Sequence, residues 1–66
     1  MTFSENLVKL RNDRGLSQKE LSEKTGITMR AYQRYEYGER EPRLSVLIAL
    51  ADFYGISLDE LACRQR

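Results

Sequence analysis

The sequence predicts an all-α domain, a compact arrangement of five helices. Each of the four glycines falls where a helical pattern of apolar residues stops, the position at which left-handed backbone commonly ends a helix: Gly15, Gly26, Gly38 and Gly55. Apolar residues recur at spacings of three and four, and no stretch alternates with the period of two that a strand would show. The chain has 66 residues, enough for one domain and no more. We therefore expect residues 1–66 to form a single domain.

The first, second and fifth helices are marked by apolar spacing and by start signals. The first is expected over residues 4–14, where three apolar residues share one helical face: Phe3, Leu7 and Leu10. The second should begin after Ser17, because Glu20 stands three residues on and the pair can form a capping box, in which each side chain accepts a hydrogen bond from the other residue's backbone N–H. It should end at the second glycine. The same pattern recurs at Ser57 and Glu60, where the fifth helix should begin.

The third helix is expected from residue 28 to about residue 37, with Thr28 as its N-cap. At about 100° per residue, one arc would face inward: Tyr32, Tyr35, Ala31 and Thr28. The opposite arc would face outward, with Met29 at its edge: Arg30, Gln33, Arg34 and Tyr37. The sequence therefore predicts two guanidinium groups and a carboxamide on the outer face of this helix.

The fourth helix, expected over residues 44–54, is more apolar than one buried stripe requires. We expect one face to join the core, with Leu50 beside it: Leu44, Leu47, Ile48, Ala51 and Tyr54. A second face would then lie in water unless another molecule covered it: Val46, Ala49 and Phe53. Together with Leu58 and Cys63, this second face is expected to form the interface of a homodimer.

Little more than Gly26 and Ile27 separates the second helix from the third. A joint this short prevents an antiparallel pair, and the helices must cross steeply, as in a helix-turn-helix. The third helix then projects outward. Arginine can bond guanine, and glutamine can bond adenine, through two hydrogen bonds in the major groove. The outward residues suit that readout, but an ordinary solvated helix face would carry the same residue types, and these residues alone leave both interpretations open.

The pattern of nearly the whole chain resembles the lambda-repressor-like, Cro/C1-type helix-turn-helix family. The likeness spans about residues 3–61 and depends on combined spacing. Its segments are SQKELSEKTGIT at residues 17–28, residues 11–15, Glu36, Gly38, Pro42, and the stretches at 50–51 and 55–61. The resemblance implies a five-helix lambda-repressor-like domain, with the helix-turn-helix at the second and third helices, that binds double-stranded DNA in the major groove.

The resemblance also implies roles for individual residues. Base contacts are expected from the third helix: Met29, Arg30, Gln33 and Arg34. Phosphate contacts are expected from residues at helix starts and in the loop after the third helix, the last two being weaker candidates: Gln18, Thr28, Arg40, Arg43, Lys19 and Arg14. Arg11 and Glu36 resemble a pair that joins the first helix to the end of the third, and we expect Arg11 to be mainly structural.

Three residues depart from the family pattern. Tyr32 and Tyr35 stand where aliphatic side chains are usual, and Ser22 stands where alanine is commonest. Two aromatic rings behind the third helix could change its tilt, and their hydroxyl groups need hydrogen-bond partners or water. The departure leaves open which of the outward side chains lies deepest in the groove.

Composition argues against several other classes. The formal net charge is only +1, but basic residues outnumber acidic ones between Lys9 and Arg43, which predicts a weakly polarised surface. The chain has no histidine and only one cysteine, and we expect no disulfide, metal or cofactor. No apolar run reaches the roughly 18 residues of a membrane span. With no phosphate-binding loop or recognisable catalytic group, we expect no enzymatic activity, and the lone thiol favours a cytoplasmic location.

The favoured interpretation is a transcriptional regulator, a repressor that acts as a homodimer on a palindromic operator. An antitoxin or restriction-controller role would use the same chemistry, and the sequence does not separate it. A different class is a protein-interaction module that keeps the fold and uses the apolar face of the fourth helix. No small-molecule effector is evident from the sequence.

Overall fold

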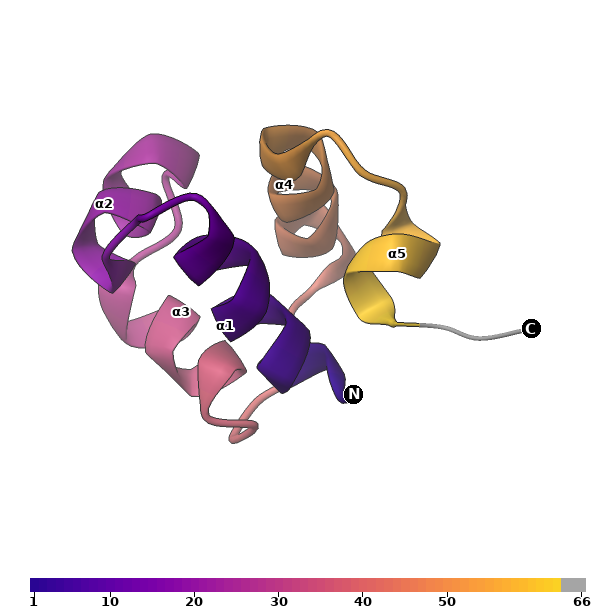
Figure 1. The fold of residues 1–66 in the computed structure, drawn as a ribbon. Coiled ribbons are helices and arrows are strands. Elements are labelled where there is room, and N and C mark those ends of the chain that lie inside the picture. The colour runs from indigo at the N-terminus through magenta and orange to yellow at the C-terminus, as the bar shows by residue number, and fades with distance from the viewer. Residues whose placement is uncertain (64–66) are drawn as a thin grey trace.

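The computed structural model describes residues 1–63 and arranges this part of the chain as five helices. They are α1 (Phe3–Asp13), α2 (Gln18–Thr25), α3 (Met29–Glu36), α4 (Leu44–Tyr54) and α5 (Leu58–Ala62). Helix α1 lies between α3 on one side and α5 on the other (Figure 1). The described residues contain no strand. The predicted all-α, five-helix class is confirmed.

The helices begin where side chains satisfy their free backbone N–H groups. The predicted capping boxes of α2 and α5 are both formed. Helix α1 begins one residue before its predicted start, because Thr2 and Glu5 form a third capping box that was not predicted. The Thr-x-x-Glu spacing is itself a capping signal, and it could have located this start. At α3, the Thr28 hydroxyl accepts a hydrogen bond from the N–H of Ala31 as the N-cap.

The core draws side chains from all five helices and from the α2–α3 joint. Its buried apolar and aromatic members are Leu7, Leu21, Ile27, Tyr32, Tyr35, Leu50, Ala51, Tyr54 and Leu61. Tyr32 is completely buried, and Tyr35 is nearly so. Because these two tyrosines fix the rotation of α3 about its axis, the residues on the opposite side of α3 must face away from the core.

The predicted faces of α4 are partly wrong. Leu44 and Ile48 were expected in the core but are 64% and 43% exposed, whereas Val46 and Phe53 pack partly against the core. Ala51 and Tyr54 are buried as expected, and Leu50, predicted beside that face, is buried with them. Because α4 is apolar on almost every side, residue spacing did not determine its rotation, and contacts with the other helices do.

Candidate nucleic-acid interface

The joint between α2 and α3 is closed by specific backbone and side-chain contacts. Gly26 has a left-handed φ of 77°, which glycine adopts without the steric cost that other residues meet. Ile27 is buried in the core, and the Ser22 hydroxyl on α2 donates a hydrogen bond to the Ile27 carbonyl. These contacts fix the direction in which α3 leaves the joint. Ser22, one of the departures from the family pattern, thus has a structural role that was not predicted.

The outer face of α3 carries charged side chains that have no internal partner. Arg30 is exposed and Arg34 is half-buried. Among the described residues, neither guanidinium forms a hydrogen bond or ion pair. Met29, beside them, is 43% exposed. Since a guanidinium group can only donate hydrogen bonds, this face is suited to a ligand rich in acceptors.

Arg30 and Arg34 also line a hollow of about 200 Å³, together with Arg40 from the loop between α3 and α4. The rest of its wall is formed by Thr28 and Ala31. Three guanidinium groups and no carboxylate line this hollow, and its charge is therefore positive. The structure thus brings together two predicted base-contact residues, Arg30 and Arg34, and two predicted phosphate-contact residues, Thr28 and Arg40.

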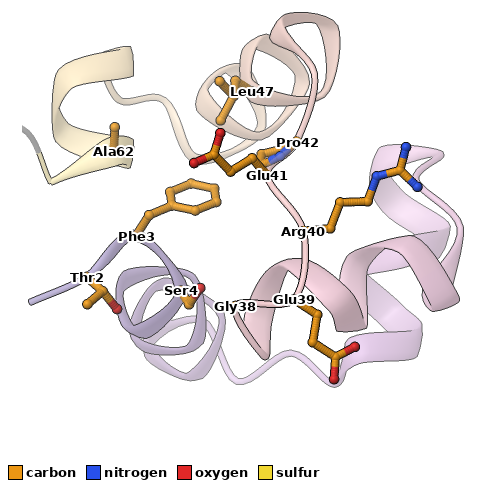
Figure 2. Close-up of a pocket in the computed structure, with 10 residues that line it drawn as sticks. All are labelled: Thr2, Phe3, Ser4, Gly38, Glu39, Arg40, Glu41, Pro42, Leu47 and Ala62. Carbon is orange, nitrogen blue, oxygen red and sulfur yellow. The ribbon is translucent and has the colours of Figure 1, made fainter.

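A larger hollow of about 470 Å³ lies beside the same loop, near the start of α1 and the end of α5. Figure 2 shows the Phe3 ring at this hollow, with the Glu41 side chain turned toward it. Arg40 lies on the wall of both hollows, and its side chain points away from the larger one (Figure 2).

Gln33, a predicted base-contact residue, is hydrogen-bonded to Gln18 on α2. The Gln33 Nε2 donates to Gln18 Oε1 at 3.1 Å, and Gln18 Nε2 donates to Glu36 Oε1 at 3.1 Å. Because a carboxylate only accepts, Glu36 requires Gln18 to point its NH₂ group inward and its carbonyl toward Gln33. Gln33 then keeps its own carbonyl oxygen and one N–H without a partner among the described residues. This coupling of Gln18 to Gln33 was not predicted.

Arg11 on α1 anchors the Glu36 carboxylate. Its Nε and Nη2 donate to the two carboxylate oxygens at 2.7 and 3.1 Å, and its Nη1 donates to the Leu16 carbonyl at 2.9 Å. Burial alone would raise the pKa of Glu36, but the Arg11 guanidinium and the other donors around the carboxylate outweigh burial and lower that pKa. Hydrogen bonding to Glu36 in turn raises the pKa of Arg11. We call Arg11, Gln18, Gln33 and Glu36 the Glu36 cluster.

The other predicted phosphate-contact residues do not line the positive hollow. The Arg14 Nη2 donates to the Tyr54 carbonyl at 3.0 Å, and its guanidinium carbon lies 4.8 Å from the centroid of the Tyr54 ring. Arg14 therefore ties the end of α1 to the end of α4. Lys19 lies in the first turn of α2 and is exposed, as is Arg43, the N-cap residue of α4.

Within residues 1–63, no group of three or more potential metal ligands is placed to hold an ion. Nor does this part of the chain contain a helix with the length and apolar character needed to cross a membrane. Helices α2 and α3 are joined by a short turn, and the outer face of α3 carries guanidinium groups without an internal partner. This arrangement defines the class of the molecule: it is a helix-turn-helix domain.

The sequence comparison agrees. A helix-turn-helix family model matches residues 7–61, and the chain belongs to the Cro/C1-type helix-turn-helix family, whose members are transcriptional regulators.

Individual relatives support this assignment. The HTH-type transcriptional regulator YqaE of Bacillus subtilis is 46% identical over 59 residues, which cover 89% of this chain and 51% of YqaE. The cryptic phage CTXphi transcriptional repressor RstR of Vibrio cholerae is 37% identical over 59 residues, 89% of this chain and 53% of RstR. A crystal structure of a transcriptional regulator from Listeria innocua matches with a TM-score of 0.88 and 32% identity, covering 98% of this chain and 61% of that one. The chain thus spans about half the length of these curated relatives.

Proposed function

We propose that this chain binds double-stranded DNA sequence-specifically by inserting α3 into the major groove. The observation that carries the proposal is the position of Arg30 and Arg34 on the outer face of α3, each without an internal partner. Each guanidinium can donate two hydrogen bonds, to O6 and N7 of one guanine. Insertion of the second helix of a helix-turn-helix in the major groove brings such side chains to base edges.

Gln33 is proposed to read adenine. Adenine presents an N6 donor beside an N7 acceptor in the major groove, and a carboxamide can pair with both. The hydrogen bond to Gln18 leaves Gln33 with a free carbonyl oxygen and a free N–H, which are the two groups that this pairing requires. Because Gln18 and Glu36 already hold this amide, less conformational freedom would be lost when DNA binds. Met29, exposed beside these residues, is proposed to make an apolar contact with a base.

Phosphate contacts are proposed at the rim of this surface. Arg40 lines the positive hollow, and the backbone N–H groups at the start of α2, near Gln18 and Lys19, suit a phosphate group. Thr28 and Arg43 are further candidates for this role. Such contacts would set the position of α3 on the duplex without carrying sequence information.

We also propose that the protein acts as a homodimer on a palindromic operator. Two exposed side chains support an apolar interface on α4 and α5, Ile48 at 43% and Leu58 at 42% exposure. Of these two, only Leu58 was predicted for the interface, since Ile48 was predicted for the core. The remaining predicted interface residues are half-buried: Val46, Ala49, Phe53 and Cys63. A twofold pair of domains can place two recognition helices about 34 Å apart, one turn of DNA.

A repressor role is supported by the relative RstR, which is named a transcriptional repressor. A dimer bound to an operator can repress by blocking access to a promoter. An antitoxin or restriction-controller role would rest on the same DNA contacts. As a DNA-binding regulator, the protein would act in the cytoplasm.

A protein-interaction module is the second candidate function. The specific observation in its favour is the apolar surface of α4 and α5, where Leu44, Ile48 and Leu58 are each more than 40% exposed. Apolar surface of this kind often marks a contact with another protein. In this case the guanidinium groups of α3 would be solvated surface charges.

The dependence of binding on salt tests the two functions against each other. A protein that contacts about 6–10 phosphates should lose about 10³–10⁵ in affinity for a random-sequence duplex between about 50 and 200 mM salt, because counterions are released from the DNA on binding. Fluorescence anisotropy of a labelled duplex would measure this slope. An affinity that does not change with salt, or no binding at low salt, would contradict the DNA-binding proposal.

A further inference from the structure

Two tyrosine hydroxyl groups are buried in the core, and neither forms a hydrogen bond of ordinary geometry with the described residues. Tyr32 on α3 is 0% exposed and Tyr54 on α4 is 3% exposed. Neither phenol oxygen has a partner at ordinary hydrogen-bond geometry among the described residues, but Tyr32 lies close enough to Glu36, and Tyr54 close enough to Tyr32, for longer hydrogen-bond interactions to affect their pKa values. Buried polar groups are nearly always hydrogen-bonded in folded proteins, because an unpaired group has lost its contact with water and gained nothing in return. Two such hydroxyl groups in one small core therefore need an explanation.

Tyr32 and Glu36 are both buried on α3 and are four residues apart, a spacing that places two side chains on the same face of a helix. Tyr32 and Tyr54 belong to the same buried core cluster. Burial is the main reason that the pKa of Tyr32 and the pKa of Tyr54 are raised, and the negative charge of Glu36 raises both further. The two tyrosines also interact with each other. The two tyrosines therefore lie between α4 and the Glu36 carboxylate at the end of α3, and both respond to the charge of that carboxylate.

We propose that Tyr54 donates a hydrogen bond toward Tyr32, and that Tyr32 donates toward the Glu36 carboxylate. One internal water would bridge any gap longer than a direct hydrogen bond. The direction follows from the chemistry of Glu36: a carboxylate only accepts, so the Tyr32 proton points to Glu36 and the Tyr32 oxygen is left to accept from Tyr54. Single buried waters with polar neighbours are a normal part of protein cores.

This arrangement makes Tyr54 a positioning residue for DNA readout, an inference that rests on the proposed function. Glu36 receives a hydrogen bond from Gln18, which in turn accepts one from Gln33. The Glu36 carboxylate would therefore accept hydrogen bonds both from the DNA-facing side and from the core. Because a fully satisfied network of buried hydrogen bonds holds its members rigidly, loss of the core donors would leave the Glu36 carboxylate, and with it the Gln18 and Gln33 amides, less firmly oriented.

Thermal unfolding of Tyr32→Phe and Tyr54→Phe tests whether the hydroxyl groups are paired. Each variant keeps the ring and removes only the oxygen. If the hydroxyl groups are hydrogen-bonded, we expect each variant to lower the midpoint of unfolding by about 4–8 °C, as a modest stability loss does in a domain of this size. If they are orphaned, their removal should leave the midpoint unchanged or raise it, and the inference fails. Tyr37→Phe is the matched control, because Tyr37 is 61% exposed and should show no change.

Base preference tests the positioning role. The Gln33→Ala variant is used first to identify the base pair that Gln33 reads. This is the one position of the half-site at which the variant loses its base preference. We expect Tyr54→Phe to reduce the preference for adenine at that position several-fold in the wild-type background, and to have no effect on preference in the Gln33→Ala background. An unchanged adenine preference in Tyr54→Phe would overturn the inference while leaving the proposed function intact. If instead Gln33→Ala alters no preference, the proposed readout by Gln33 fails, and with it the positioning role of Tyr54.

Discussion

Helices α3 and α4 both have one face in the core, but they present opposite chemistry on the other. On α3 the outward side chains include Arg30 and Arg34, which have no internal hydrogen-bond partner. On α4 the outward side chains include Leu44 and Ile48. Charged donors without an internal partner can form strong hydrogen bonds with a polyanion. Exposed apolar side chains favour association with another protein, because burial removes their surface from water. Under the proposed function, α3 would contact DNA and α4, together with α5, would contact a second subunit.

The largest effect is expected beneath the α3 face. Glu36→Ala would remove the carboxylate that pairs with Arg11 and would leave that guanidinium, whose side chain is 15% exposed, without its partner. We expect a loss of about 3–5 kcal/mol in the free energy of unfolding, measured by urea denaturation. The control is Asp13→Ala, which breaks the exposed Lys9–Asp13 pair and should cost about 1 kcal/mol or less. Equal losses in the two variants would contradict a structural role for the Glu36 cluster.

The next effect concerns the outward side chains of α3. Arg30→Ala and Arg34→Ala should each cost about 1–3 kcal/mol of DNA-binding free energy and relax base preference at one position of each half-site. Arg40→Ala should weaken binding to every sequence alike and reduce the salt slope by about one, because a phosphate contact carries no base information. Binding curves on matched and mismatched duplexes would separate the two behaviours. A uniform loss in Arg30→Ala and Arg34→Ala would exclude direct readout by those residues.

A paired substitution tests the division between the two surfaces. Leu58→Asp places a charge on the apolar surface at α5, and we expect monomers by sedimentation velocity with the fold retained. Met29→Asp changes a residue of similar exposure on α3; it should leave the dimer intact and weaken DNA binding by charge repulsion. If Leu58→Asp sediments with unchanged mass, the proposed dimer surface is wrong.

The smallest effect is a dependence of stability on pH. The pKa of Glu36 is lowered below its reference value of 4.5 in the folded protein, so the unfolded chain binds a proton there more readily than the folded chain. The stabilisation from this group is present above the unfolded pKa and is lost as pH falls through the folded one. We expect the free energy of unfolding to decrease from about pH 5 to about pH 3, and to decrease less in Glu36→Gln. Parallel curves for the two proteins would show that Glu36 does not contribute.

The sequence predicted α3 more accurately than α4, and the reason is physical. On α3 the two tyrosines, Tyr32 and Tyr35, are three residues apart and the charged residues lie mostly on the opposite face. Residue spacing alone therefore predicted which side of α3 faces the core. Helix α4 has apolar residues on nearly every side, and its rotation depends on where Leu50 and Ala51 meet the other helices, which spacing does not encode.

The sequence pattern likewise does not predict which side chains form hydrogen bonds with one another. The resemblance to the family indicated Arg11 and Glu36 as a pair, but it did not indicate that Gln18 would link Glu36 to Gln33. It indicated Arg14 as a weaker candidate for a DNA phosphate contact, but it did not indicate that the Arg14 guanidinium would contact the end of α4. Long polar side chains have several possible partners, and the packed neighbours select among them.

Selection of bound duplexes from a random pool tests most directly whether α3 reads base edges. The wild-type protein should enrich a palindrome with two half-sites about 10 base pairs apart. The Arg30→Ala and Gln33→Ala proteins should each enrich the same motif with preference lost at one different position per half-site. If the wild-type protein enriches no motif, or if both variants enrich an unchanged motif, α3 does not read the sequence.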